Sequence, residues 1–285
     1  METLQVGRAK LTWLNGGVTH LDGGSMFGVV PKALWERKYP NNEKNQIELR
    51  TDPILMELDG SYLLIDSGIG WNKLSEKQKR NFGVLEETKL EASLLDLGLT
   101  VDDIEIVLMT HLHYDHANGL TKLTDEEKYE SVFKKAKIYV SQVEWDEMRH
   151  PNIRSVNTYW EENWKPISEQ ICTFTDEVEI LSGLTMVHTG GHSDGHAIIR
   201  FQDDKESFLH MADIMPTHAH QNKLWVLAYD DYPVQSVLQK EYWMNQGYKE
   251  NAWFTFYHDA YFRAIKFNET GEIIDQIKRM RYAYK

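Results

Sequence analysis

Cysteine is almost absent from this chain, which has one, Cys172, among 285 residues. A single cysteine excludes an internal disulfide and suits a reducing compartment. Long apolar runs are absent as well, since no 18 consecutive apolar residues occur. The N-terminal METLQVGRAK has no apolar stretch of the signal-peptide kind. We therefore expect a cytoplasmic protein that neither spans nor binds a membrane.

Positive charge is also scarce, with 31 Lys and Arg against 44 Asp and Glu and a formal net charge of −13. Such a chain repels polyanions, which excludes nucleic acids and anionic lipid surfaces as expected partners. Apolar residues make up 41% of the chain, with 9 Trp and 14 Tyr, which is enough for a sizeable core. No Pro- or Ser-rich linker interrupts it, so we predict a single domain over residues 1–285.

Apolar segments indicate two similar halves. Residues 47–68 predict two antiparallel strands, and residues 86–97 predict a helix with Leu90, Leu94 and Leu97 on one face. The order of strands, helix, strand, strand and helix then recurs along the chain. This order predicts a layered α/β fold with two sheet-bearing halves and helices outside.

Three local signals refine this organisation. The glycine-rich segment 15–30 is expected to form a loop near a site. Ser141 and Glu144 have the spacing of a capping box that opens a helix. Pro233 suits the first turn of a helix that runs to about Asn245.

The segment THLHYDHANG, residues 110–119, places His111, His113, Asp115 and His116 within six positions. Imidazole and carboxylate are the ligands that first-row divalent metals prefer. The spacing does not match the i, i+3 or i, i+4 pairs of helical metal sites. It fits a strand that breaks into a tight loop, because IEIVLMT comes directly before it.

Three more metal-capable residues follow apolar strands. His192 follows LTMVHTGG, Asp213 follows SFLHMA, and His258 follows WFTFY. Five histidines and two aspartates exceed what one catalytic zinc ion needs, so we predict two divalent ions. Zinc is the first expectation, with iron, manganese and cobalt as alternatives. We assign His111, His113 and His192 to one ion and Asp115, His116 and His258 to the other, with Asp213 bridging.

Two residues near this set are candidates for orienting it. Asp66, in the segment IDSG, is either an ordinary turn former or a residue that orients the site. His196 lies four residues beyond His192, and we expect it to support the site rather than bind metal.

The motif HLHYDH, the GGH at 190–192, Asp213 after a strand and His258 near the end together resemble the signature of the metallo-β-lactamase superfamily. The resemblance covers essentially the whole chain. It implies a four-layer αββα sandwich with a dinuclear metal site at one edge of the two sheets. The segment LTWLNGGVTHLDGGSMFGVVPKALW is similar to the quorum-quenching lactonases of the YtnP type, which implies an N-acyl homoserine lactone as substrate.

We expect a hydroxide that bridges the two metals to attack the lactone carbonyl. Asp115 is the candidate catalytic residue that carries the proton to the leaving alkoxide. Related dinuclear hydrolysis of thioesters, aryl esters or organophosphate triesters is the alternative, and a metal-bound regulatory or binding protein is the non-enzyme alternative. The short C-terminal segment argues against a thioesterase of the glyoxalase II type. Exposed aromatic loops are compatible with a homodimer.

An acyl chain requires an apolar wall. Met26 and Phe27 are candidates for it, and Trp160 and Trp164 are candidates for a lid, with core packing as the alternative for all four.

One position departs from the resemblance. The best-known homoserine lactonases have a Tyr three residues after the bridging Asp, and this chain has Pro216 there. Tyr114, His218 or another group then holds the substrate carbonyl, or the metal holds it alone.

Overall fold

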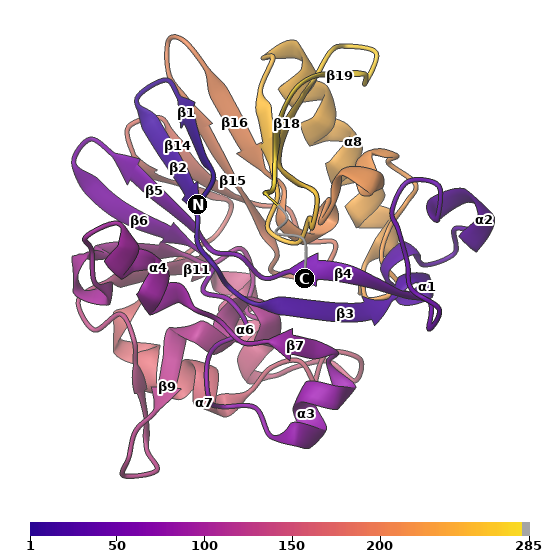
Figure 1. The fold of residues 1–285 in the computed structure, drawn as a ribbon. Helices are drawn as coiled ribbons and strands as arrows, with labels where there is room; N and C mark the ends of the chain where they lie inside the picture. The colour runs from indigo at the N-terminus through magenta and orange to yellow at the C-terminus, as the bar shows by residue number, and fades with distance from the viewer. Residues whose placement is uncertain (281–285) are drawn as a thin grey trace.

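Two seven-stranded sheets form the centre of the computed structural model, which describes residues 1–280 (Figure 1). The first sheet has the order β1–β2–β5–β6–β8–β11–β12, and the second has its seven strands in chain order. The first consists of β1 (Thr3–Val6), β2 (Ala9–Trp13), β5 (Ile54–Leu58), β6 (Ser61–Ile65), β8 (Ile106–Leu108), β11 (Lys137–Ser141) and β12 (Ile171–Phe174). The second consists of β13 (Glu177–Leu181), β14 (Leu184–His188), β15 (Ala197–Gln202), β16 (Ser207–His210), β17 (Trp253–Thr255), β18 (Phe262–Phe267) and β19 (Ile273–Lys278).

Helices and two smaller sheets surround this centre. The smaller sheets are β4 (Gln46–Arg50), β3 (Val18–Asp22) and β7 (Val84–Glu86), and the pair β9 (Thr121–Leu123) and β10 (Tyr129–Ser131). The α-helices are α1 (Gly23–Phe27), α2 (Lys32–Trp35), α3 (Glu76–Asn81), α4 (Leu90–Asp96), α5 (Tyr114–Ala117), α6 (Gln142–Arg149), α7 (Glu161–Trp164) and α8 (Pro233–Lys249). The 3₁₀ helices are η1 (Val101–Asp103), η2 (Asn118–Leu120), η3 (Lys165–Gln170), η4 (Ala212–Ile214) and η5 (His218–Gln221).

Parallel pairing explains where the main helices lie. Strands β6, β8, β11 and β12 pair in parallel, so each connection between them must cross over the sheet. Helix α4 lies in the crossover from β6 to β8, and α6 lies in the crossover from β11 to β12. In the second sheet, β16 and β17 are parallel, and α8 connects them. Within the described residues, none of the helices combines the length and apolar character that crossing a bilayer requires.

Three apolar layers hold the sandwich together. The layer between the sheets joins residues such as Leu11 of β2 to residues such as Phe208 of β16. A second layer packs the outer face of the first sheet against Leu94 of α4 and Met148 of α6. A third packs the outer face of the second sheet against Met244 of α8. These layers give the order helix, sheet, sheet, helix, so the predicted αββα sandwich is confirmed.

Two local predictions are corrected. Segment 15–30 is not a loop, because β3 and α1 occupy its centre and β3 pairs with both β4 and β7. Its glycines flank the strand, so they do not interrupt its pairing. Segment 47–68 contains three strands instead of two, because β4 belongs to the small sheet while β5 and β6 form the predicted hairpin.

The predicted helix over 86–97 is shorter than expected. Leu90 and Leu94 are buried as predicted, but Leu97 lies beyond the last helical residue and is 39% exposed. Gly98 follows with φ +76°, a left-handed conformation that ends the helix at low cost for glycine.

Candidate metal centre

The seven predicted metal ligands meet at one place between the two halves of the sandwich. They form three overlapping groups, and in each group one potential ligand atom per residue lies within 4.8 Å of the others. The groups share His111 and His116, so they make one continuous cluster. The groups are His111, His113 and His192; His111, His116 and Asp213; and Asp115, His116 and His258.

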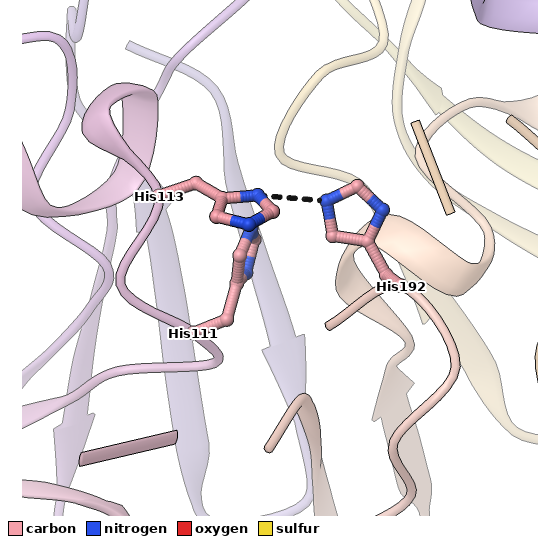
Figure 2. A group of neighbouring side chains, drawn as sticks. All are labelled: His111, His113 and His192. Carbon is pink, nitrogen blue, oxygen red and sulfur yellow. Dashed lines mark hydrogen bonds between the residues drawn. The ribbon is translucent and has the colours of Figure 1, made fainter. Parts of the chain in front are cut away.

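The first group joins the two halves of the molecule. His111 and His113 come from the loop after β8, His192 comes from the loop after β14, and the ring of His113 faces that of His192 (Figure 2). Nδ1 of His113 and Nε2 of His192 are 3.0 Å apart. Oδ2 of Asp213 lies 3.4 Å from Nε2 of His192 and 4.0 Å from Nε2 of His111.

The group of Asp115, His116 and His258, called the second group from here on, lies on the other side of Asp213. Nε2 of His116 and Nε2 of His258 are 3.0 Å apart. Oδ1 of Asp213 is 3.2 Å from the His258 nitrogen and 3.5 Å from the His116 nitrogen. Oδ2 of Asp115 is 3.6 Å from Nε2 of His258. The two carboxylate oxygens of Asp213 thus face different groups, which is the placement a bridging carboxylate needs.

In His116 and His258, a hydrogen bond on the far side of the ring determines which ring nitrogen points to the centre of the second group. Nδ1 of His116 lies 2.8 Å from a carboxylate oxygen of Asp66, and Nδ1 of His258 donates to the backbone carbonyl of Arg50 at 2.7 Å. Both Nδ1 atoms therefore carry a proton, and when the rings are neutral, as metal binding requires, both Nε2 atoms present lone pairs. Two lone pairs at 3.0 Å repel unless a positive charge lies between them, so this geometry fits a bound cation.

The first group is oriented in the same way. Nδ1 of His192 lies 2.9 Å from Oδ1 of Asp230. Nδ1 of His111 lies 3.1 Å from the Thr110 hydroxyl, which itself donates to Asp66. Nε2 of His111 is buried and has no hydrogen-bond partner among the described residues. This set of nitrogen and oxygen donors without sulfur fits a divalent ion of the zinc, iron, manganese or cobalt kind.

The electrostatics of the cluster also favour a cation. Burial lowers the pKa of His111 and of His113 well below the usual range, so these rings are neutral, the form that binds metals. Burial also disfavours a charge on His116, but the carboxylates of Asp213 and Asp66 outweigh it and raise the pKa of His116 well above its ordinary value. The carboxylates thus create a strong preference for positive charge at the centre of the cluster.

Residues outside the predicted set complete the centre. Asp66 orients His116, one of the two roles that the sequence left open for it. Nε2 of His196 accepts the backbone N–H of Asp213 at 3.2 Å, so this ring supports the loop of the central aspartate. Asp230 was missed, because it lies in the acidic loop YDDYP, whose sequence gives no sign of which carboxylate turns inward.

The predicted role of the Glu144 side chain in a capping box is wrong. The Ser141 hydroxyl accepts the backbone N–H of Glu144 at 3.0 Å, as in the predicted capping box. The carboxylate of Glu144 does not return to the helix start. It instead accepts the backbone N–H of Leu112 at 2.7 Å, which places it beside the histidine loop.

A cavity of about 490 Å³ opens onto the cluster. Its polar end includes His113, Asp115, His192, Asp213 and His258. Apolar side chains make up much of the remaining wall: Leu21, Met26, Leu49, Phe82, Tyr114, Leu227 and Tyr229. Such a cavity has the size and character of a small-molecule site.

Of the six pocket candidates, Met26 and Tyr114 line this cavity, and the other four lie outside its lining. Phe27 is stacked between the rings of Trp35 and His220, inside a separate apolar cluster. His218 bonds to Asp259 at 2.6 Å.

The two tryptophans that were candidates for a lid also lie outside the cavity lining. Trp160 stacks on Tyr114 with ring centroids 5.1 Å apart, so it supports a lining residue. Trp164 packs edge-on to Trp145 in the layer that covers the first sheet.

Comparisons with known proteins agree with this geometry. The model of the Metallo-beta-lactamase superfamily matches residues 47–241. A crystal structure of a probable metal-dependent hydrolase from Staphylococcus aureus is 47% identical, covers 98% of this chain and 100% of that one, and superposes with a TM-score of 0.94. The dizinc quorum-quenching lactonase AidC has the same fold at 16% identity, with a TM-score of 0.78 over 99% of this chain and 98% of that one.

One curated relative is similar in sequence. An N-acyl homoserine lactonase from Bacillus sp. is 23% identical over 175 residues, which is 53% of this chain. The match spans 58% of the length of that relative.

Proposed function

Because this chain belongs to the metallo-beta-lactamase superfamily and is a metal-dependent hydrolase, we propose that it opens the lactone ring of N-acyl homoserine lactones. One observation carries the proposal: the His and Asp cluster forms the polar end of a largely apolar cavity of about 490 Å³. An acylated lactone has matching chemistry, with a polar reacting ring and an apolar chain. The similarity to the Bacillus lactonase supports the same substrate class.

We assign the two metal positions to the two groups that Asp213 separates. His111, His113 and His192 would hold one ion, and Asp115, His116 and His258 would hold the other. Two bound zinc ions would supply Lewis-acid charge that polarises an ester carbonyl and makes hydroxide available at neutral pH. Asp66 and Asp230 would keep His116 and His192 in the tautomer that presents Nε2 to the ions.

Asp115 is the residue that we propose for proton transfer to the leaving alkoxide. Its carboxylate lines the cavity and lies 3.6 Å from Nε2 of His258, so it can touch both the centre and a bound substrate. Its backbone carbonyl accepts the Tyr257 hydroxyl at 2.7 Å, which fixes the position of this turn. An ordered carboxylate at the edge of the cluster is suited to carrying one proton between reacting oxygens.

Tyr114 is the residue that we propose for holding the substrate carbonyl, because Pro216 has no donor to offer. Tyr114 lines the cavity next to Asp115, and its ring is packed against Phe82 and Trp160. Burial raises the pKa of Tyr114 well above its ordinary value, so its hydroxyl keeps the proton that a hydrogen bond to a carbonyl requires.

Proton release tests the proposed reaction directly. N-Acyl homoserine lactones with short and with long acyl chains are added to metal-loaded protein and to chelator-stripped protein. We expect fast release that the chelator abolishes, and the rates will rank the chain lengths. The absence of release from protein that holds two metals per chain would exclude the lactonase reaction. Thioesters, aryl esters and phosphotriesters would then be the substrates to test.

A further inference from the structure

Glu144, in the first turn of α6, is a fully buried carboxylate that belongs to neither metal group. It accepts three hydrogen bonds. The backbone N–H of Leu112 and the hydroxyl of Tyr159 donate to Oε1 at 2.7 and 2.9 Å, and the hydroxyl of Ser193 donates to Oε2 at 2.6 Å. A buried charge is costly, so three donors arranged around one carboxylate indicate a specific role.

These contacts join the two loops that carry the first metal group. Leu112 lies between His111 and His113, and Ser193 directly follows His192. The loops come from different sheets, and their histidines face each other across the gap (Figure 2). The Glu144 carboxylate therefore accepts hydrogen bonds from both loops.

Two more residues at the start of α6 also bond to the segment that follows His192. The Ser141 hydroxyl donates to the carbonyl of Gly195 at 2.5 Å, and Glu147 accepts the backbone N–H of Asp194 at 2.9 Å. Gly195 lies so close to the helix that a Cβ atom there would be 2.0 Å from the backbone nitrogen of Glu144. The helix thus holds three consecutive residues, 193–195, immediately after His192.

The second metal group is held by other means. Asp66 orients His116, and the carbonyl of Arg50 orients His258. The three hydrogen bonds of Glu144 reach neither residue. The loss of Glu144 is therefore expected to affect the two groups unequally.

We propose that Glu144 is a positioning residue that sets the spacing of His111, His113 and His192 and thereby the metal affinity of this group. The inference rests on the metal centre proposed above. The loss of a group that supports metal ligands typically weakens metal binding by 10–100-fold. Without Glu144, we expect metal affinity to fall by this factor at the first group alone.

Cobalt(II) titration of the metal-free full chain, followed by its visible absorption, tests the inference. Wild type is expected to bind two equivalents, and Glu144→Ala is expected to bind one of them 10–100-fold more weakly. Glu144→Gln can still accept from Leu112 and Tyr159 and can donate to Ser193, so it should restore binding. Tyr257→Phe is the control for the other group, because it removes the hydroxyl that donates to the backbone carbonyl of Asp115.

The spectrum of the first bound equivalent identifies the weakened group. In Glu144→Ala it should match the spectrum of His113→Ala, in which the second group alone is complete. A match to His258→Ala, or equal weakening of both equivalents, would overturn the inference, as would unchanged binding. Fewer than two equivalents in wild type would overturn the metal centre and the inference together.

A milder variant covers the case in which Glu144→Ala does not fold. Ser193→Ala removes one of the three donors and leaves the carboxylate in place. We expect the same selective weakening at a smaller magnitude. Two unchanged equivalents in this variant would count against the inference.

Discussion

Four of the five histidines of the candidate centre have two tasks, one for each ring nitrogen. One nitrogen faces the cluster, and in four of the five rings the other is hydrogen-bonded to a residue outside it, as His116 is to Asp66 and His192 is to Asp230. These partners fix the ring orientation and the tautomer before any ion arrives. Preorganisation of this kind lowers the cost of assembling the centre at the moment of binding.

Asp115→Asn tests the proton-transfer role at the scale of a single residue. The amide keeps the shape of the carboxylate but accepts no proton, so we expect turnover of N-acyl homoserine lactones to fall by about 10²–10⁴-fold. Metal analysis should still find metal in the variant. Steady-state proton release measures turnover, with Asp125→Asn at an exposed turn as the control. Full activity of Asp115→Asn would remove this residue from the mechanism.

At the scale of elements, the helices differ in what their buried faces do. Helix α4 has a small apolar face, with Leu90 and Leu94 packed in the layer over the first sheet. Helix α8 buries a charged residue, Lys240, whose Nζ donates to the backbone carbonyls of His220 and Trp225. Apolar contact therefore holds the first helix, whereas a buried hydrogen-bonded ammonium also anchors the second.

Adjacent leucines of α4 provide a test of its orientation. Leu94 is fully buried and Leu95 is 65% exposed, so the two differ in environment and not in chemistry. Leu94→Ala should lower the free energy of unfolding by about 2–5 kcal/mol, because it leaves a cavity in the outer layer. Leu95→Ala should change it by less than about 0.5 kcal/mol. Urea denaturation measures both, and similar losses would contradict this packing.

Lys240 predicts a pH dependence of stability. Burial lowers the pKa of Lys240 to about 7, against a smaller opposing effect of Asp230. Between about pH 7 and 10 the unfolded chain therefore binds a proton that the folded chain has released, so the free energy of unfolding rises with pH. The Lys240 amine raises the free energy of unfolding by up to about 1.4 kcal/mol for each pH unit in this range.

Urea denaturation of wild type and Lys240→Met at pH 7.5 and 9 measures this contribution. Methionine preserves the apolar stem without a titrating group, so the rise with pH should be smaller in the variant. Equal slopes in the two proteins would show that Lys240 titrates alike in the folded and unfolded states.

At the scale of the whole molecule, the candidate centre joins the two halves of the sandwich. The first sheet carries His111 and His113 on the loop after β8 and His116 on α5, and the second carries His192, Asp213 and His258 in the segments that follow three of its strands. An ion bound to both sets connects the sheets at this edge. Metal binding is therefore expected to stabilise the complete fold and not only the loops.

Metal removal tests this coupling. A ligand that binds only the folded state adds about 2.7 kcal/mol to the free energy of unfolding at 100 times its dissociation constant. We expect chelator-stripped protein to unfold at lower urea concentration than zinc-loaded protein. In His258→Ala, the difference between the urea midpoints of stripped and loaded protein should be smaller. Identical midpoints for stripped and loaded wild type would indicate that the sheets do not depend on the ions.

The metal-capable residues could be identified from the sequence because their chemistry depends on residue type and local spacing. The motif HLHYDH, with His and Asp residues placed after apolar strands, predicted a cluster that the structure brings together within 4.8 Å in each group. Superfamily and sandwich fold follow from the same pattern, and both predictions are confirmed. The individual metal assignments and the lactone substrate remain proposals.

The tertiary structure alone decided which residues support and surround the centre. Asp230 reaches His192 across 38 positions, and Glu144 reaches Leu112 across 32, so no local spacing could connect them. The cavity wall was settled in the same way, since Met26 lines it while its neighbour Phe27 is buried in a separate cluster. The sequence by itself determined the ligand chemistry, because that belongs to the side chains. Their partners depended on contacts between distant segments, which exist only once both sheets are packed.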